Sequence, residues 1–186
     1  MKTIKYLFAL LAVSLVTVSC SDDDDGTPDP VNEEELITTL TATMSPDGGG
    51  TPVVFVSRDL DGDGPNDPVI TVSGNLTAGT TYNGTIVVLN ESEDPAENIT
   101  LEVIEEDDEH QFFFVAGGNL DVTTAYSDMD GDGNPLGVQF SVIANTASTG
   151  TLTFILRHEP KKPNDGTPSD AGGETDISAT FDVTVE

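Results

Sequence analysis

The stretch Asp176-Ile177-Ser178-Ala179-Thr180-Phe181-Asp182-Val183-Thr184-Val185 decides the fold class of this chain. Every second residue from Ile177 to Val185 is apolar, and the residues between them are polar. Because side chains of a β-strand alternate between its two faces, this pattern predicts a strand with one buried and one exposed face. A buried face on a strand of this length requires a second layer packed against it.

Short segments of the same kind recur along the chain, and turn-forming residues separate them. The predicted strands are 36–44, 52–58, 69–73, 81–90, 111–116, 120–126, 138–144, 151–157 and 176–185. The turn signals are Pro46-Asp47-Gly48-Gly49-Gly50, Asn83-Gly84, Gly117-Gly118 and Thr149-Gly150. About nine short strands at a spacing of roughly ten residues predict a mainly β domain, a single antiparallel β-sandwich of Ig-like or jelly-roll topology.

One segment fits two kinds of secondary structure. Asp94-Pro95-Ala96-Glu97 has the N-cap, the first-turn Pro and the third-position Glu of a helix start, with Ile99 and Val103 on the buried face. Ile99, Leu101 and Val103 also alternate as they would in a strand. We favour one short helix near 95–106.

The composition limits the partners that this chain can have. The 186 residues suit one domain, and 34 Asp and Glu against six Lys and Arg give a net charge of −28. Nucleic acids and anionic lipid surfaces attract basic proteins, so this charge argues against both as direct partners. The apolar fraction of 36% is spread along the chain and is high enough for a folded core.

The first residues have the features of a targeting segment. Lys2 and Lys5 precede a mostly apolar stretch, 6–18, that is too short to span a bilayer comfortably. Ser19-Cys20 follows and resembles a bacterial lipobox, although Thr17 stands where Leu is preferred. The resemblance implies a lipoprotein signal peptide over 1–19 and lipidation of Cys20. The alternative is a plain secretory signal with an incidental cysteine.

An acidic run follows Cys20 at once: Ser21, Asp22, Asp23, Asp24 and Asp25. It resembles the export signal of Bacteroidota surface lipoproteins, which implies an outer-membrane location facing the cell exterior. The alternative is a solvated acidic tether. We predict a tether over 20–34 and the β-sandwich domain over 35–186. Lipidation of Cys20 leaves no cysteine for a disulfide, so core packing or metal must hold the domain together.

Two acidic loops resemble the DxDxDG calcium motifs of extracellular repeats. The carboxylates that would bind calcium are Asp59, Asp61, Asp63 and Asp67 in the first loop, and Asp128, Asp130 and Asp132 in the second, where Asn134 offers a carbonyl. Carboxylates at alternate positions can converge on one hard cation, and the following Gly allows the sharp turn. Ile70 and Gln139 replace the Glu expected at the twelfth position. We predict structural calcium; the alternative is two ordinary Asp-Gly turns.

Both histidines of the chain have a Glu beside them. The pairs are Glu109-His110, before a Phe-rich strand, and His158-Glu159, at the end of another strand. If these strand ends meet, two imidazoles and a carboxylate would make a site for Zn²⁺, Cu²⁺ or iron. The alternative is two surface histidines. The long loop 159–174 follows, and its Lys161 and Lys162 either contact a partner or pair with acids of the chain itself.

The known catalytic motifs are absent from the sequence, which has no GxSxG, HExxH, P-loop or GxGxxG. We therefore expect no enzymatic activity, with a hydrolase built from dispersed carboxylates as the remaining alternative. The tether, the strand pattern and the strings RDLDGDG, DEHQFFF, LRHEPKK and GGETDI resemble small flavobacterial cell-surface lipoproteins. Such lipoproteins accompany TonB-dependent receptors. This resemblance implies capture of a ligand or metal beside such a receptor; the alternative is a structural or adhesive module with calcium-rigidified loops.

Overall fold

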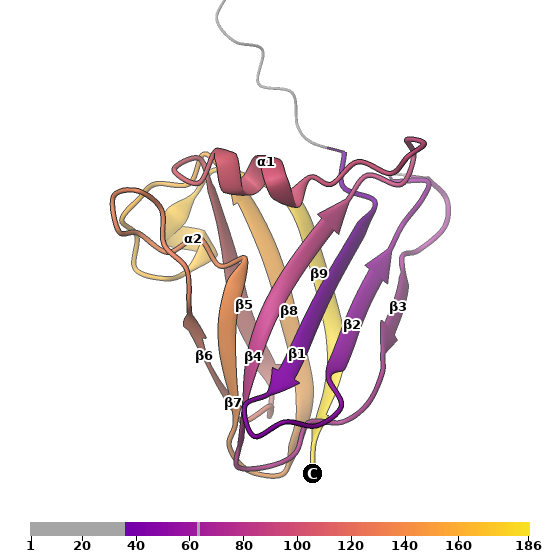
Figure 1. The fold of residues 1–186 in the computed structure, drawn as a ribbon, viewed down its shortest axis with the longest axis vertical. Helices are drawn as coiled ribbons and strands as arrows, with labels where there is room; N and C mark the ends of the chain where they lie inside the picture. Colours follow the sequence, from indigo (N-terminus) through magenta and orange to yellow (C-terminus); the bar gives the residue numbers. More distant parts are fainter. Residues whose placement is uncertain (1–35, 63) are drawn as a thin grey trace, which may run out of the picture. The chain divides into compact units, whose positions relative to one another are not determined.

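The computed structural model describes residues 36–62 and 64–186. Over these residues the chain forms two antiparallel sheets, which confirms the predicted antiparallel β-sandwich (Figure 1). The elements are β1 Thr39–Pro46, β2 Val53–Arg58, β3 Val69–Val72, β4 Thr80–Leu89, α1 Thr100–Glu105, β5 His110–Gly118, β6 Val122–Tyr126, β7 Gln139–Ala144, β8 Ser148–His158, α2 Pro168–Ala171 and β9 Glu174–Val185. The strand order is β3-β2-β1-β4-β7-β6 in one sheet and β5-β8-β9 in the other.

The core lies between the two sheets and is built around a cluster of phenylalanines. Phe154 of β8 is at its centre, with ring-centroid distances of 5.6 Å to Phe140, 5.8 Å to Phe114 and Phe181, and 6.3 Å to Phe55. These rings come from both sheets, and most of their contacts with Phe154 are edge-to-face. Apolar burial between the sheets is therefore the main stabilising contribution in a domain whose described part has no disulfide.

Three of the predicted turns lie inside strands. Asn83-Gly84 is in the middle of β4, Gly117-Gly118 ends β5, and Thr149-Gly150 belongs to β8. At Gly84 the reason is packing: a Cβ atom there would lie 2.3 Å from Cζ of Phe140, its partner on β7. The glycine makes room for an aromatic ring rather than for a turn.

The helix α1 covers one end of the sandwich (Figure 1). Its buried residues include Val103, and Ile99 just before it is also buried, as expected for the helical alternative. The predicted N-cap at Asp94 is wrong, because the helix begins at Thr100 with Ile99 as N-cap. Asn90 and Glu97 exchange two backbone hydrogen bonds of 3.0 Å, and this pairing holds the residues between them in a turn.

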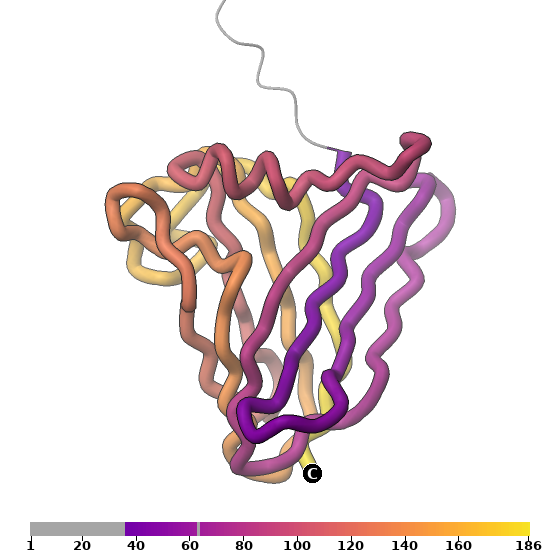
Figure 2. Tube along the Cα trace, viewed as in Figure 1, coloured from indigo at the N-terminus to yellow at the C-terminus, as the bar shows by residue number. Residues whose placement is uncertain are grey.

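The C terminus lies at the end of the domain opposite α1 (Figure 2). The long loop after β8 lies at the α1 end and contains the short helix α2, which was not predicted from the sequence. Thr167 caps it by accepting a hydrogen bond from the Asp170 backbone N–H, and Pro168 follows at the first position. None of the helices in the described part of the chain is long and apolar enough to cross a membrane.

The predicted signal peptide 1–19, the lipidated Cys20, the acidic run Ser21–Asp25 and the tether 20–34 lie outside the described residues. So does Asp63 of the first acidic loop. The described residues from Leu36 onward belong to one compact unit. Both sheets, both histidines and the second acidic loop belong to it.

Candidate metal centre

The two strand ends that carry the histidines meet. His110 opens β5, His158 closes β8, and the two residues are direct partners in the antiparallel register. Their ring centroids are 4.6 Å apart with an angle of 39° between the planes. Both histidines are buried, with exposed fractions of 0% and 4%, so the predicted alternative of two surface histidines is wrong. On β5, His110 lies two residues from the buried Phe112, and on β8, His158 lies two residues from the buried Leu156. Both histidines therefore face the core side of their strand.

A β-bulge in β9 brings a carboxylate to this pair. Leu156 is paired with Ile177 and Arg157 with Thr175, so Asp176 is the extra residue between them. The strict alternation of β9 would place Asp176 on the outer face, but a bulge redirects the side chain at that position. Its side chain is 0% exposed, and Oδ1 lies 3.8 Å from His158 Nδ1. Asp176 is not among the ligands predicted from the sequence, since alternation alone gives no sign of a bulge.

His110, His158 and Asp176 each offer one ligand atom, and these atoms all lie within 4.8 Å of one another. His110 Nδ1 is 3.2 Å from the carbonyl oxygen of Glu106, which follows α1. Because a carbonyl only accepts hydrogen bonds, this contact places the proton on Nδ1 and the lone pair of the neutral ring on Nε2. A backbone carbonyl that fixes the tautomer in this way is typical of metal-binding histidines.

The chemistry of this donor set suits a transition-metal ion. Two imidazole nitrogens and one carboxylate oxygen are the ligands that Zn²⁺, Cu²⁺ and non-haem iron accept in proteins, and calcium prefers oxygen alone. Three protein ligands leave at least one coordination position open. His158 Nδ1 and Asp176 Oδ1 are 3.8 Å apart and all three donors lie within 4.8 Å of one another, so a small contraction of the side chains would bring them around one ion.

A second group lies on the outer side of the same histidine. Glu109, His158 and Glu159 also place one ligand atom each within 4.8 Å, and both glutamates are exposed. Glu109 Oε2 is 3.8 Å from His158 Nε2. The structure thus brings together Glu109, Glu159 and His158 from the predicted site, and it joins His110 and His158 to Asp176 on the inner side.

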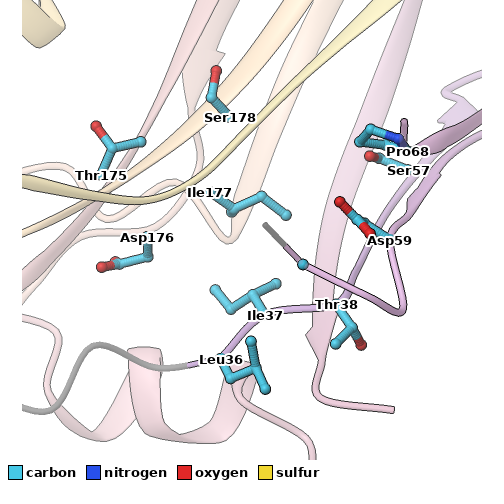
Figure 3. Close-up of a pocket in the computed structure, with 11 residues that line it drawn as sticks. Leu36, Ile37, Thr38, Ser57, Asp59, Pro68, Thr175, Asp176, Ile177 and Ser178 are labelled. Atoms are coloured by element: carbon cyan, nitrogen blue, oxygen red, sulfur yellow. The ribbon is translucent and has the colours of Figure 1, made fainter. Parts of the chain in front are cut away.

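A pocket of about 450 Å³ lies beside the buried cluster (Figure 3). It is lined by Asp176 on one side and by Asp59 of the first acidic loop on the other. In this view the side chains of Ile37 and Ile177 stand between the two carboxylates. The first acidic loop and the histidine cluster are therefore neighbours around one pocket, with apolar side chains between their charged groups.

In the first acidic loop, Asp59, Asp61 and Asp67 line a surface pocket of about 270 Å³ together with Asn66. Asn66 donates a hydrogen bond of 2.6 Å to Asp61 Oδ2, and this bond holds the pKa of Asp61 below its ordinary value. Three carboxylates around one open pocket can bind calcium with water as the remaining ligand. Calcium in this loop stays a prediction.

In the second acidic loop, the structure uses the first two carboxylates for internal contacts. Asp128 accepts hydrogen bonds of 2.7 Å from the backbone N–H groups of Gly137 and Gln139. Asp130 accepts hydrogen bonds from Asp132 and Asn134, and the Asn134 carbonyl accepts one from Asp130 N–H. Calcium at Asp128, Asp130, Asp132 and Asn134 stays a prediction, and an ion there would have to replace these hydrogen bonds.

The ammonium group of Lys162 pairs with a carboxylate of the second acidic loop. Lys162 Nζ lies 3.3 Å from Asp130 Oδ2, and the two side chains are 6% and 1% exposed. Burial raises the pKa of Asp130, but the hydrogen bonds from Asn134 and Lys162 outweigh it, so the pKa lies below its ordinary value. Lys161 pairs in turn with Asp170 at 2.8 Å. Of the two predicted roles for these lysines, the structure shows pairing with acids of the chain itself.

No family model, curated protein or solved structure matches this chain.

Proposed function

We propose that this chain is a non-enzymatic, surface-exposed outer-membrane lipoprotein that captures a transition-metal ion, Zn²⁺ or Cu²⁺, beside a TonB-dependent receptor. The observation that carries the proposal is the meeting of His110, His158 and Asp176 at one end of the sandwich. The chain has two histidines, and they are direct partners across β5 and β8. A β-bulge in β9 turns Asp176 toward them. A site with an open coordination position can exchange its ion, which capture and delivery require.

Anchoring and export belong to the N-terminal part of the proposal. The Ser19-Cys20 lipobox and the acidic run after it support attachment of the domain to the outer face of the outer membrane through lipid. Cys20→Ala should release the protein into the soluble fraction. Replacement of Asp22 to Asp25 by Ala should leave the protein attached but protected from protease added to whole cells.

The metal site is tested by titration calorimetry of residues 21–186, which include the whole compact unit, with Zn²⁺ and Cu²⁺. His110→Ala and Asp176→Asn should each weaken binding by at least about tenfold, since each removes a ligand. Asp182→Asn is the matched control, because Asp182 is an exposed aspartate on the same strand. Equal affinity of Asp176→Asn and Asp182→Asn would remove the cluster as the metal site.

A second candidate function is a structural or adhesive module with calcium-rigidified loops. It is supported by the pocket around Asp59, Asp61 and Asp67, which faces solvent at the same end of the domain. Extracellular calcium is millimolar, so a site with a dissociation constant of roughly 0.1–1 mM would be filled. Absence of Zn²⁺ and Cu²⁺ binding together with a calcium-dependent melting temperature would favour this function over metal capture.

A further inference from the structure

His158 is shared by the two groups of metal ligands. Its Nδ1 faces Asp176 in the buried group, and its Nε2 faces Glu109 in the exposed group, each at 3.8 Å. The two nitrogens of one ring therefore point toward two different sets of carboxylates. Only the His158 ring separates an ion bound by the exposed group from the buried ligands.

The side chains of the inner group are almost completely buried. The side chain of Asp176 is 0% exposed, that of His158 6%, and His110 is completely buried. The Glu109 side chain, in contrast, is 53% exposed, and Glu159 is exposed as well. A hydrated divalent ion reaches the exposed carboxylates first, and they can replace part of its water before it is buried.

The backbone fixes the two glutamates at this place. Glu159 N–H donates a hydrogen bond of 2.7 Å to the Glu109 carbonyl, which extends the pairing of β5 and β8 by one residue. Glu159 has a φ of 49°, the one positive φ of a non-glycine residue among the described residues. Gly173 packs against the same peptide, since a Cβ atom there would lie 2.2 Å from the His158 carbonyl oxygen. A strained residue held by its surroundings is a frequent feature of functional sites.

We propose that Glu109 and Glu159 form an entry site that takes a divalent transition-metal ion from solvent and passes it, through His158, to the buried ligands His110 and Asp176. This inference rests on the metal-capture function proposed above. The transfer is an exchange of ligands: the ion leaves the glutamate oxygens, His158 Nε2 and water as it gains His158 Nδ1, the nitrogen of His110 and the oxygen of Asp176. The proton of the His158 ring moves in the opposite sense, from Nδ1 to Nε2, through solvent. The role of the glutamates is thus in the rate of loading rather than in the final affinity.

The test is stopped-flow loading of residues 21–186 with CoCl₂, because Co²⁺ in a four- or five-coordinate protein site absorbs visible light far more strongly than the hydrated six-coordinate ion. The double variant Glu109→Gln/Glu159→Gln should load about tenfold more slowly at low ionic strength, while its equilibrium affinity changes much less. The matched control is Glu105→Gln/Asp108→Asn, which removes the same two charges from exposed residues at the same end of the domain. This control should load at nearly the wild-type rate.

A second variant isolates the entry site itself. His110→Ala removes a buried ligand and leaves Glu109, His158 and Glu159 in place, so it should bind Co²⁺ weakly and rapidly, without the visible band of the wild type. Wild-type loading rates in the glutamate double variant, equal slowing in the control, or complete loss of Co²⁺ binding in His110→Ala would each overturn the entry site. Failure of the wild type to bind Co²⁺, Zn²⁺ or Cu²⁺ would instead overturn the metal-capture function.

Discussion

Lys162 of the long loop and Asp130 of the second acidic loop form an ion pair of 3.3 Å from which solvent is almost excluded. Lys162 Nζ also donates a hydrogen bond to the carbonyl oxygen of Asp107, just after α1. One ammonium group thus joins three segments that are far apart in the sequence. Its neighbour Lys161 also pairs with an aspartate, Asp170, but there both side chains are more than one-third exposed.

These two neighbouring lysines allow a controlled test of the buried pair. Lys162→Met should lower the free energy of unfolding by about 3–5 kcal/mol, because it leaves Asp130 buried without its cation. Lys161→Met should lower it by about 1 kcal/mol or less, since exposed pairs contribute little. Urea unfolding followed by circular dichroism measures both. Similar values for the two variants would show that the Lys162 pair does not hold the loop.

The same pair predicts a specific dependence on pH. The pKa of Asp130 is lowered in the folded protein relative to the unfolded value of about 3.9. Its contribution to stability is therefore complete above that value and is lost as pH falls through the lower, folded pKa. The difference in unfolding free energy between wild type and Asp130→Asn should be large at pH 7 and shrink below about pH 4. A difference that stays constant down to pH 3 would contradict this account.

The strand pattern was readable from the sequence, because the strands are short segments rich in apolar and β-branched residues, and several of them have alternating faces. All nine predicted segments form strands, with ends shifted by a few residues. The meeting of His110 and His158 was only a conditional expectation, since strand register depends on the whole sheet and not on either segment. Asp176 could not be found at all, because its inward position results from a bulge between β8 and β9.

Gly84 is a second case in which the local sequence does not decide the structure. Gly84 follows an asparagine, and Asn-Gly is a strong hairpin signal in isolation. In the folded chain it lies in a strand beneath the Phe140 ring, a contact between residues more than 50 positions apart. Local propensity describes the turn that Asn-Gly can make, and tertiary packing decides whether it makes one.

Calcium should act through one acidic loop and not through both. In the first loop Asp59, Asp61 and Asp67 surround an open pocket, whereas in the second Asp130 already has Lys162 as its cation. Millimolar calcium should therefore raise the melting temperature of the wild type, since an ion that binds only the folded state stabilises it. We expect Asp61→Asn to abolish this increase and Asp132→Asn to keep it. Differential scanning calorimetry with calcium or EDTA measures the effect. Equal responses of the two variants, or no response of the wild type, would refute it.

Substitution of Gly84 tests how tightly the aromatic core is packed. Its Cβ position is 2.3 Å from Phe140 Cζ, and the Phe140 ring is itself stacked on Phe114 at 4.6 Å and against Phe154 at 5.6 Å. The ring cannot move away without disturbing both neighbours, so Gly84→Ala should destabilise the fold by about 1–3 kcal/mol, as overpacking does.

Gly48 is the matched control for Gly84, because a Cβ atom there meets nothing within 4 Å. Gly48→Ala should change the unfolding free energy by about 0.5 kcal/mol or less, in either direction. The comparison separates steric crowding from the general effect of replacing glycine, which acts on the unfolded chain at both positions. If Gly84→Ala were as stable as Gly48→Ala, the Phe140 ring would have to shift easily. The core between β4 and β7 would then be looser than the stacked rings indicate.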